Sequence, residues 1–351
     1  MFYIGTYTNG KCKGIYLSRL DLQTGALSAP ELVAEASNPS FLAIHPSNQY
    51  LYAVNEDATT KGEHTGSVSA FALDAGSGKL TPLNKQSSKG EAPCHISIDK
   101  TGRNALVVNY SSGSVIVLPI QEDGHLVEAS CHIQHTGSSV DKSRQKEAHA
   151  HSVFLDPSNS YAIVSDLGND KVYSYKLNTE GGTLSEVGTA TMKPGAGPRH
   201  YAFHPNGKWG YVINELDNTV TQTNFDKSTG KMSVVKSYST LPKGYNKTSY
   251  CSEILVHPNG KFLYGSNRLH DSIAIFSIDQ SNGDLKLLGT EPTQGKYPRN
   301  FSIDPSGKFM LVANQNEGGI TVFHVDSETG MLKSTGHRLD LDHPVCIKFL
   351  P

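Results

Sequence analysis

The sequence has few cysteines, and the way they are spaced excludes two kinds of cysteine chemistry. There are five of them, an odd number, and they lie far apart and form no Cys-x-x-Cys pair. This argues against a disulfide framework and against a thiolate zinc site, and it predicts a reducing compartment. The five residues are Cys12, Cys94, Cys131, Cys251 and Cys346.

The chain also lacks a segment suited to a membrane. No apolar run approaches the roughly 20 residues that span a bilayer. The N-terminal stretch "MFYIGTYTNGK" alternates like a strand and has neither the basic nor the apolar region of a signal peptide. We therefore expect a cytoplasmic protein with no membrane partner.

Charge of neither sign is in excess, because 31 Lys and Arg stand against 33 Asp and Glu, spread along the chain. No basic tract for nucleic acid is present, so we expect no nucleic-acid partner. Glycine and proline are plentiful, with 33 and 17 residues. Such a turn-rich composition is typical of many short strands and favours an all-β fold.

A turn of the form Gly-x-Leu or Gly-x-Met recurs seven times, at intervals of 46 to 58 residues. Each copy follows a β-type run such as "SVSAFALD" or "SIAIFSID". Glycine lets the chain adopt positive φ in a hairpin turn, and the Leu or Met then returns to the core. The glycines are Gly25, Gly78, Gly124, Gly182, Gly230, Gly283 and Gly330.

A second pattern alternates with the first and consists of an apolar strand, a turn and another apolar strand. Its six copies include "SFLAIHPSNQYLYAVN", "RHYAFHPNGKWGYVIN" and "RNFSIDPSGKFMLVAN". Together the two patterns give about four strands in roughly 50 residues, the signature of a β-propeller blade. The His-Pro pairs at His45, His204 and His257 fall in the turn of this pattern, and we interpret them as structural.

The two chain ends account for the seventh blade. The C-terminal "HPVCIKFLP" resembles only a first strand, whereas the N-terminal region supplies a second, third and fourth strand. We therefore predict a single domain over residues 1–351, a seven-bladed β-propeller with four antiparallel strands per blade. The ring is closed by pairing of the N- and C-terminal segments in one blade. A solenoid is the alternative, but it would need capping repeats.

The repeat places polar residues at one rim of the predicted channel, which we call the site rim. First strands begin there, and the antiparallel second strands end there. The residues at the start of first strands are Ser40, Cys94, His151, Arg199, Ser252, Arg299 and Val345, followed by Phe41, His95, Ser152, His200, Glu253, Asn300 and Cys346. The residues just past second strands are Tyr7, Glu56, Tyr110, Leu167, Glu215, Arg268 and Gln315.

Arginine, histidine and glutamate on the site rim suggest an anion site with proton transfer. Arginine binds a carboxylate or phosphate through two hydrogen bonds, and histidine beside a carboxylate transfers protons near neutral pH. Ordinary ion pairs on a solvated rim are the alternative. The inserts 135–150 and 238–251 each precede a first strand, so we expect them to overhang this rim.

A metal site is a further possibility that the sequence does not require. His149 and His151 in "EAHAHS" would share one side of an extended segment. Such a pair binds a metal only with a third and a fourth ligand, for which His95 or His200 is available. We favour a His151 free of metal.

Several segments resemble the propeller-type lactonase family over essentially the whole chain. They are "YIGTYT", "AHAHSVFLDPSNSYAIVSDLGNDKVYSY", "GPRHYAFHPNGKWGYVINEL" and "SEILVHPNGKFLYGSNRLHDSIAIF". That family includes bacterial cycloisomerase-type 6-phosphogluconolactonases and fungal 3-carboxy-cis,cis-muconate lactonizing enzymes. The resemblance implies a catalytic group of His151, Arg199, Glu215 and Arg268, all on the site rim.

The activity that the resemblance implies is hydrolysis of 6-phospho-D-glucono-1,5-lactone to 6-phosphogluconate in the pentose phosphate pathway. His151, poised by Glu215, would activate water, and the arginines would hold the phosphate and the oxyanion. Around them we expect a substrate-binding group of Arg299, His200, His95, His149, Glu253 and Arg144. We expect no metal or organic cofactor, and a monomer or weak homo-oligomer.

Three alternatives are kept. A muconate-type lactonizing enzyme would use the same residues on a dicarboxylate. A non-enzymatic propeller that binds a protein partner would expose apolar patches on a rim. A calcium-dependent lactonase would need carboxylates, such as Glu56, Glu215 and Glu253, converging on the channel axis.

Overall fold

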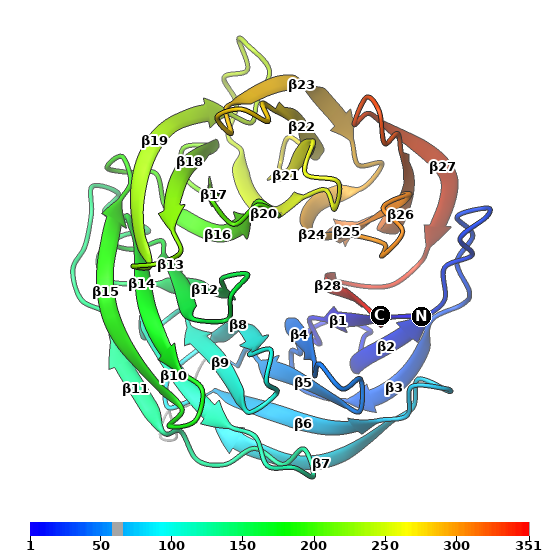
Figure 1. The fold of residues 1–351 in the computed structure, drawn as a ribbon. Helices are drawn as coiled ribbons and strands as arrows, with labels where there is room; N and C mark the ends of the chain where they lie inside the picture. The colour runs from blue at the N-terminus through cyan, green and yellow to red at the C-terminus, as the bar shows by residue number, and fades with distance from the viewer. Residues whose placement is uncertain (58–65, 351) are drawn as a thin grey trace.

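The computed structural model describes residues 1–57 and 66–350, which form seven four-stranded antiparallel sheets in a ring (Figure 1). The first strand of each sheet lies nearest the centre of the ring and the fourth lies on the outside. These described residues contain no helix, and hence none long and apolar enough to cross a membrane. The predicted seven-bladed β-propeller is confirmed.

Six sheets are each built from one continuous segment. The first three are β4 (Phe41–Ile44), β5 (Tyr50–Asn55), β6 (Ser67–Leu73) and β7 (Leu80–Ser87); β8 (Pro93–Ile98), β9 (Asn104–Asn109), β10 (Ser114–Pro119) and β11 (Cys131–Gln134); and β12 (Ala150–Leu155), β13 (Tyr161–Asp166), β14 (Lys171–Asn178) and β15 (Thr183–Thr191). The next three are β16 (Pro198–Phe203), β17 (Trp209–Asn214), β18 (Thr219–Asp226) and β19 (Lys231–Ser239); β20 (Tyr250–Val256), β21 (Phe262–Arg268), β22 (Ser272–Ile278) and β23 (Leu285–Pro292); and β24 (Lys296–Ile303), β25 (Phe309–Glu317), β26 (Gly319–Val325) and β27 (Leu332–Leu339).

The seventh sheet closes the ring with strands from both ends of the chain. Its strands are β28 (Pro344–Phe349), β1 (Phe2–Thr6), β2 (Gly14–Ser18) and β3 (Glu31–Glu35). β28 pairs antiparallel with β1, so that Ile4 lies opposite Ile347, and the two termini lie side by side in Figure 1. The C-terminal segment is thus the first strand of the blade that the N-terminus begins, as predicted.

The core lies between neighbouring sheets. The second strands β9, β13 and β17 are buried along their whole length, because sheets cover them on both sides. In one cluster Trp209 and Ile213 of β17 pack with Leu263 and Phe276 of the next sheet. This double burial explains why inner strands read as continuous apolar runs rather than as alternating ones.

Several of the repeated turns accept a hydrogen bond from the neighbouring sheet. All seven glycines of the Gly-x-Leu/Met turn have positive φ, between 59° and 84°, and each turn links a third strand to a fourth. Four second-strand tyrosines donate a hydrogen bond of 2.9–3.0 Å to the carbonyl oxygen of such a glycine in the following sheet. The pairs are Tyr3–Gly78, Tyr52–Gly124, Tyr211–Gly283 and Tyr264–Gly330.

The His-Pro turns lie between first and second strands, on the rim opposite the site rim, which we call the far rim. Nε2 of His45, His204 and His257 donates to the carbonyl oxygen of Gly102, Gly260 and Gly307 respectively, at 2.9 Å in each case. Each glycine belongs to the equivalent turn of the next sheet. These contacts support a structural role for the three histidines.

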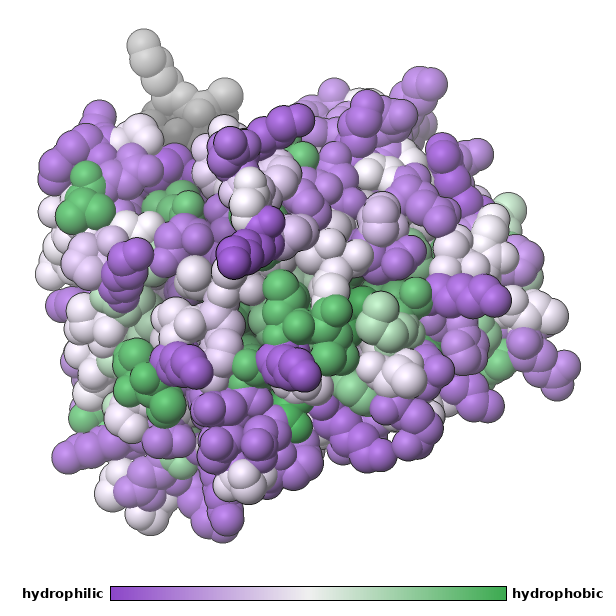
Figure 2. Space-filling model, turned by 90° about the horizontal axis from the view of Figure 1, so that it is seen from above, coloured by the Kyte–Doolittle hydropathy of each residue, from purple (hydrophilic) through white to green (hydrophobic). Residues whose placement is uncertain are grey.

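Figure 2 shows the ring from the side, where the surface is mostly hydrophilic with an apolar patch near the middle. Among the described residues, nine large apolar side chains are exposed, including Val234 and Val235 on the outer strand β19. On the site rim the exposed apolar residues are Val140 and Leu269. Within the described part of the site rim, these two large apolar residues lie in separate loops.

Candidate active site

A bulge begins most of the first strands and turns one extra residue toward the channel mouth. In β16, Pro198 pairs with Asn214 and His200 pairs with Ile213, so that Arg199 has no partner in the ladder. The same irregularity occurs at Cys94, His151 and Arg299. A bulge re-aims side chains, which is why Arg199 can contact Glu215 on the rim while the next residue, His200, faces the channel interior.

The bulged residues and the ends of the second strands surround a cavity of about 340 Å³. Arg144 reaches it from the insert 135–150, and Tyr250 reaches it from the end of the insert 238–251. Both inserts thus contribute to the site rim, as the sequence predicts. The residues that line the cavity are Glu56, Cys94, Tyr110, Arg144, His151, Glu215, Tyr250, Arg268, Tyr297 and Arg299.

Glu215 gathers three arginines at one side of this cavity. Its Oε1 lies 2.7 Å from Nη2 of Arg144, and its Oε2 lies 3.0 Å from Nε of Arg199 and 2.6 Å from Nη2 of Arg268. Burial by itself raises the pKa of Glu215, but Arg268, Arg199 and Arg144 hold it well below its usual range. Glu215 is therefore an anion at neutral pH.

The expected contact between Glu215 and His151 is not formed. Both carboxylate oxygens of Glu215 are occupied by arginine, and in the described part of the chain no hydrogen bond joins it to His151. The sequence repeat correctly predicted that both residues lie on one rim, but it could not show which of the nearby cations Glu215 would contact. Glu215 organises arginines and does not orient the imidazole.

Arg199 lies behind Glu215 rather than in the cavity wall. Besides its bond to Glu215, its Nη1 donates to the carbonyl oxygen of Ser252 at 2.9 Å and contacts Nε2 of His200 at 3.1 Å. Burial, with repulsion from Arg268 and Arg299, lowers the pKa of Arg199 to about 10, so it stays charged at neutral pH. The donors at its Nε and Nη1 are thus bound to protein groups.

Arg268 and Arg299 keep unused donors beside the cavity. Arg268 donates to the carbonyl oxygen of Cys251 at 2.7 Å, yet its buried Nε has no partner among the described residues. Arg299 lies over the ring of Tyr7 at 5.3 Å and approaches Glu56 only to 4.0 Å. Within residues 1–57 and 66–350 its side chain donates no hydrogen bond, so it is the arginine best prepared to bind an anion.

His151 is a neutral imidazole on the cavity wall. Burial, followed by the nearby charges of Arg199 and Arg299, lowers its pKa well below 6.5. The Sγ of Cys94 lies 3.9 Å from Nδ1 of His151 and donates instead to the His151 carbonyl oxygen at 3.3 Å. The imidazole is thus both unprotonated and little engaged, as a general base requires.

His200, Glu253 and His95 form a layer beneath the cavity and do not line it. Nδ1 of His200 lies 2.8 Å from Oε1 of Glu253, whose other oxygen accepts a hydrogen bond from Asn300. His95 lies against Phe41, with ring centroids 4.0 Å apart, and its Nε2 has no partner in the described chain. Burial lowers the pKa of both His200 and His95.

His149 braces the wall from outside. Its ring stacks on Tyr110 with centroids 4.6 Å apart, and its Nδ1 donates to the Tyr110 carbonyl oxygen at 2.9 Å. Among the described residues, no third or fourth side chain joins His149 and His151 in a set that could bind a metal. No group of three or more His, Cys, Asp and Glu that could hold a metal occurs among the residues the structure describes.

The carboxylates considered for calcium are each bound to protein groups. Glu215 binds arginines, Glu253 binds His200 and Asn300, and Glu56 accepts from the hydroxyl of Tyr7 at 3.0 Å and 3.1 Å. A calcium site would have to displace these partners, so the donor set does not fit that ion.

Sequence reasoning missed the aromatic part of the wall. Tyr250 and Tyr297 line the cavity but were not among the predicted residues, and Tyr297 lies 5.2 Å beneath the guanidinium of Arg268. Tyr297 has a positive φ of 65°, and it stands two residues before Arg299 in "YPRN". The likeness of "YPRN" to "GPRH", which contains Arg199, was the sequence signal that could have pointed to Tyr297.

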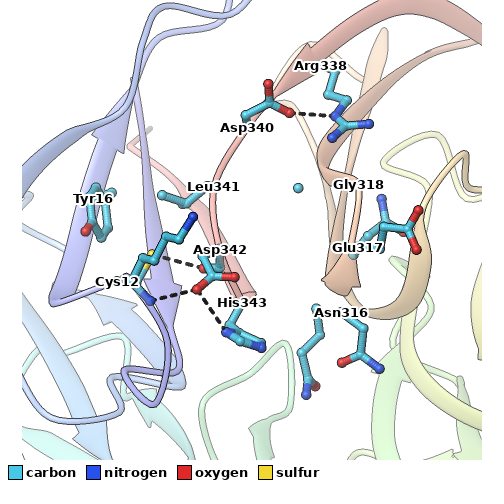
Figure 3. A pocket seen from close by; sticks show the side chains of 14 residues that line it. Cys12, Tyr16, Asn316, Glu317, Gly318, Arg338, Asp340, Leu341, Asp342 and His343 are labelled. Atoms are coloured by element: carbon cyan, nitrogen blue, oxygen red, sulfur yellow. Dashed lines mark hydrogen bonds and ion pairs between the residues drawn. The ribbon is translucent and has the colours of Figure 1, made fainter.

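A second pocket, of about 420 Å³, lies between the sheet β24–β27 and the closing sheet (Figure 3). Three of its charged side chains already bind protein groups. Arg338 donates to Asp340 at 2.8 Å, and Asp342 accepts from the backbone N–H of Lys11 at 2.7 Å. None of the residues predicted for the site lies in it.

Fold and cavity together define a propeller whose channel mouth combines a neutral histidine with an excess of arginine. The chain belongs to the family described as lactonase, 7-bladed β-propeller, which it matches over residues 1–349. It is therefore a lactonase-type hydrolase by family, as the sequence resemblance implied.

Two relatives and one solved structure make the relationship specific. A 6-phosphogluconolactonase of Bacillus subtilis is 39% identical, with 99% of this chain and 97% of that protein covered. A 6-phosphogluconolactonase of Formosa agariphila is also 39% identical, over 86% and 85%. The structure of a periplasmic gluconolactonase of Pseudomonas aeruginosa has a TM-score of 0.92 at 30% identity, over 100% and 98%.

Proposed function

We propose that this protein hydrolyses 6-phospho-D-glucono-1,5-lactone to 6-phosphogluconate. The observation that carries the proposal is the charge of the cavity wall, where Arg144, Arg268 and Arg299 stand against Glu56 and Glu215, with Arg199 buried directly behind Glu215. This excess of positive charge suits a phosphate, which carries nearly two negative charges at neutral pH. An uncharged sugar lactone would offer no anion to Arg299, whose side chain donates no hydrogen bond within the described residues.

Arg299, Arg268 and Arg144 are the proposed anion-binding groups. Among the described residues the side chain of Arg299 donates no hydrogen bond and the buried Nε of Arg268 has no partner, whereas Arg144 is the exposed member, with 34% of its side chain accessible. Guanidinium groups bind phosphate through paired hydrogen bonds. Arg199 is proposed to support Glu215 from behind rather than to touch the substrate.

His151 is the proposed general base. It takes a proton from water as the water oxygen attacks the lactone carbonyl carbon, and an arginine stabilises the oxyanion that forms. When this intermediate collapses, the bond from the carbonyl carbon to the ring oxygen breaks. His151 then gives its proton to that oxygen, which leaves a hydroxyl group and a carboxylic acid, and the acid releases its proton to solvent to become the carboxylate. No covalent bond to the protein is needed.

The test is hydrolysis of freshly generated 6-phosphogluconolactone above its spontaneous rate, beside unphosphorylated glucono-1,5-lactone and with and without EDTA. We expect acceleration that EDTA leaves unchanged and a preference for the phosphorylated lactone of about 100-fold or more, since each desolvated charge pair contributes several kcal/mol. Arg299→Ala should abolish most of that preference. No acceleration by the folded wild type, or equal rates on both lactones, contradicts the proposal.

A further inference from the structure

Two loops on the site rim deliver the groups that surround Glu215. The loop between β11 and β12 carries Arg144, and the loop between β15 and β16 leads into Arg199. Residues 192–197 of the second loop also hold Glu215 itself, because the backbone N–H of Glu215 donates to the carbonyl oxygen of Gly197 at 2.7 Å. The spacing of the cluster therefore depends on how these loops are fixed.

Asp170, in the turn between β13 and β14, contacts both loops. Its Oδ1 accepts from Nε2 of Gln145 at 2.8 Å and from the N–H of Gly197 at 2.7 Å. Its Oδ2 accepts from Oγ of Ser139 at 2.5 Å and from the N–H of Gly195 at 2.7 Å. Two of these donors lie in each loop, and each oxygen binds one donor from each.

Asp170 is 2% exposed and makes no ion pair within the described residues. A buried carboxylate without a cation is unfavourable unless hydrogen bonds compensate it. All four of its partners are donors, so an acceptor at both oxygens is required. An asparagine would place an N–H group against two of them.

Equivalent turns in other blades do only part of this. Asn218 donates to the carbonyl oxygen of Ser249, and Asp271 accepts from the N–H of Tyr297, in each case reaching the loop before the following sheet. Asp170 does the same through Gly195 and Gly197, and in addition it holds the insert 135–150 before its own sheet. The added contacts accompany the insert that brings Arg144 to the cavity.

We propose that Asp170 is a positioning residue for lactone hydrolysis, which clamps the Arg144 loop to the Arg199 loop and so sets the geometry of the arginine cluster on Glu215. The inference rests on the proposed function for its catalytic part. Asp170 touches no residue of the cavity wall directly and acts through Gln145, which follows Arg144, and through Gly197.

The chain offers a matched control. Asp156 of the same blade is 1% exposed and also accepts four hydrogen bonds, two at each oxygen, but on the far rim. Its donors are the N–H and hydroxyl of Ser158 and the N–H groups of Ser160 and Tyr161. Asp170→Asn and Asp156→Asn therefore each replace a buried carboxylate that accepts four hydrogen bonds, at opposite ends of one sheet.

The experiment compares these two variants in steady-state hydrolysis of 6-phosphogluconolactone, in thermal unfolding and in amide hydrogen exchange. We expect similar falls in melting temperature, but a loss of kcat/KM of about 100-fold only in Asp170→Asn, since small misplacements of binding groups have effects of that size. Exchange should rise in residues 138–146 and 193–198 of Asp170→Asn alone. Ser139→Ala, which removes one donor, should give an intermediate loss if Asp170→Asn does not fold.

Equal kcat/KM in the two Asp→Asn variants, with an active wild type, overturns the proposal and leaves the proposed function intact. An inactive wild type contradicts the proposed function, and the exchange measurement then decides the clamp by itself. Unchanged exchange in both loops of Asp170→Asn overturns it in either case.

Discussion

The two rims of this propeller are formed by opposite ends of the same strands, and their polar side chains bind different partners. On the far rim, His204 and Asp156 pair with backbone groups of turns, and every such contact holds a turn or a neighbouring sheet. On the site rim, Glu215 pairs with arginine side chains, and Arg268 and Arg299 keep unused donors. Side chains that bind backbone stabilise the ring, whereas side chains that bind one another can exchange partners with a ligand.

Replacing His151 should give the largest contrast between the rims. We expect His151→Ala to reduce kcat for 6-phosphogluconolactone by about 10²–10⁴-fold, the usual contribution of a general base. The measurement is steady-state kinetics on protein shown by its melting temperature to be folded. A folded variant with the kcat of the wild type would remove His151 from the reaction.

Removing Glu215 tests whether the site rim is held together by charge. Glu215→Ala leaves Arg199 and Arg268 buried at 3% and 4% exposure without their anion. Breaking a buried pair in this way destabilises proteins by about 3–5 kcal/mol. Urea unfolding at neutral pH measures the loss, with Glu215→Gln as a variant that keeps the shape. A loss under about 1 kcal/mol, the range of an exposed pair, would contradict the geometry described above.

Much of this comparison could be predicted from the sequence. The repeat fixes where strands start and stop, so it predicted the ring, its closure and the rim on which His151, Arg199, Glu215 and Arg268 lie. It also separated the His-Pro histidines from the site, because their turn is on the other end of the strands.

The partners of these residues could not be predicted, for two physical reasons. A regular strand would send Arg199 and His200 to opposite faces, but the bulge at Arg199 turns its side chain to Glu215 on the site rim while His200 faces the channel interior. Which of the nearby cations Glu215 contacts depends on differences of less than an ångström in side-chain position, and the spacing of residues in the sequence does not encode these differences. For the same reasons His200, His95 and Glu253 were expected at the substrate but lie one layer below.

Acidification should weaken the channel side of the molecule through its buried histidines. The pKa of His95 and of His151 is lowered well below 6.5 by burial, so the unfolded chain binds protons there that the folded protein does not. The free energy of unfolding is therefore unaffected by these imidazoles above the pKa that they have in the unfolded chain, and it decreases as the pH falls below that pKa. Between about pH 7.5 and about pH 5.5 each such imidazole should remove about 1.4 kcal/mol.

His95→Phe isolates that effect, because His95 already packs against Phe41 and Phe154 and its Nε2 lacks a partner in the described chain. The free energy of unfolding, measured in urea at the two pH values, should fall less in the variant by about 1.4 kcal/mol. The same pH dependence in variant and wild type would mean that His95 takes up a proton in the folded state.

The smallest effect is expected where the far rim is cut. His204→Ala removes the hydrogen bond of 2.9 Å to the carbonyl oxygen of Gly260, which keeps its second donor, Nε2 of Gln280, at 3.0 Å. The net loss of one such hydrogen bond destabilises a protein by about 1 kcal/mol. Urea unfolding of His204→Ala measures this, and kinetics on the same sample should give the kcat of the wild type. A large fall in kcat would mean that the far rim transmits strain to the cavity through β16, and the two rims could then no longer be assigned separate tasks.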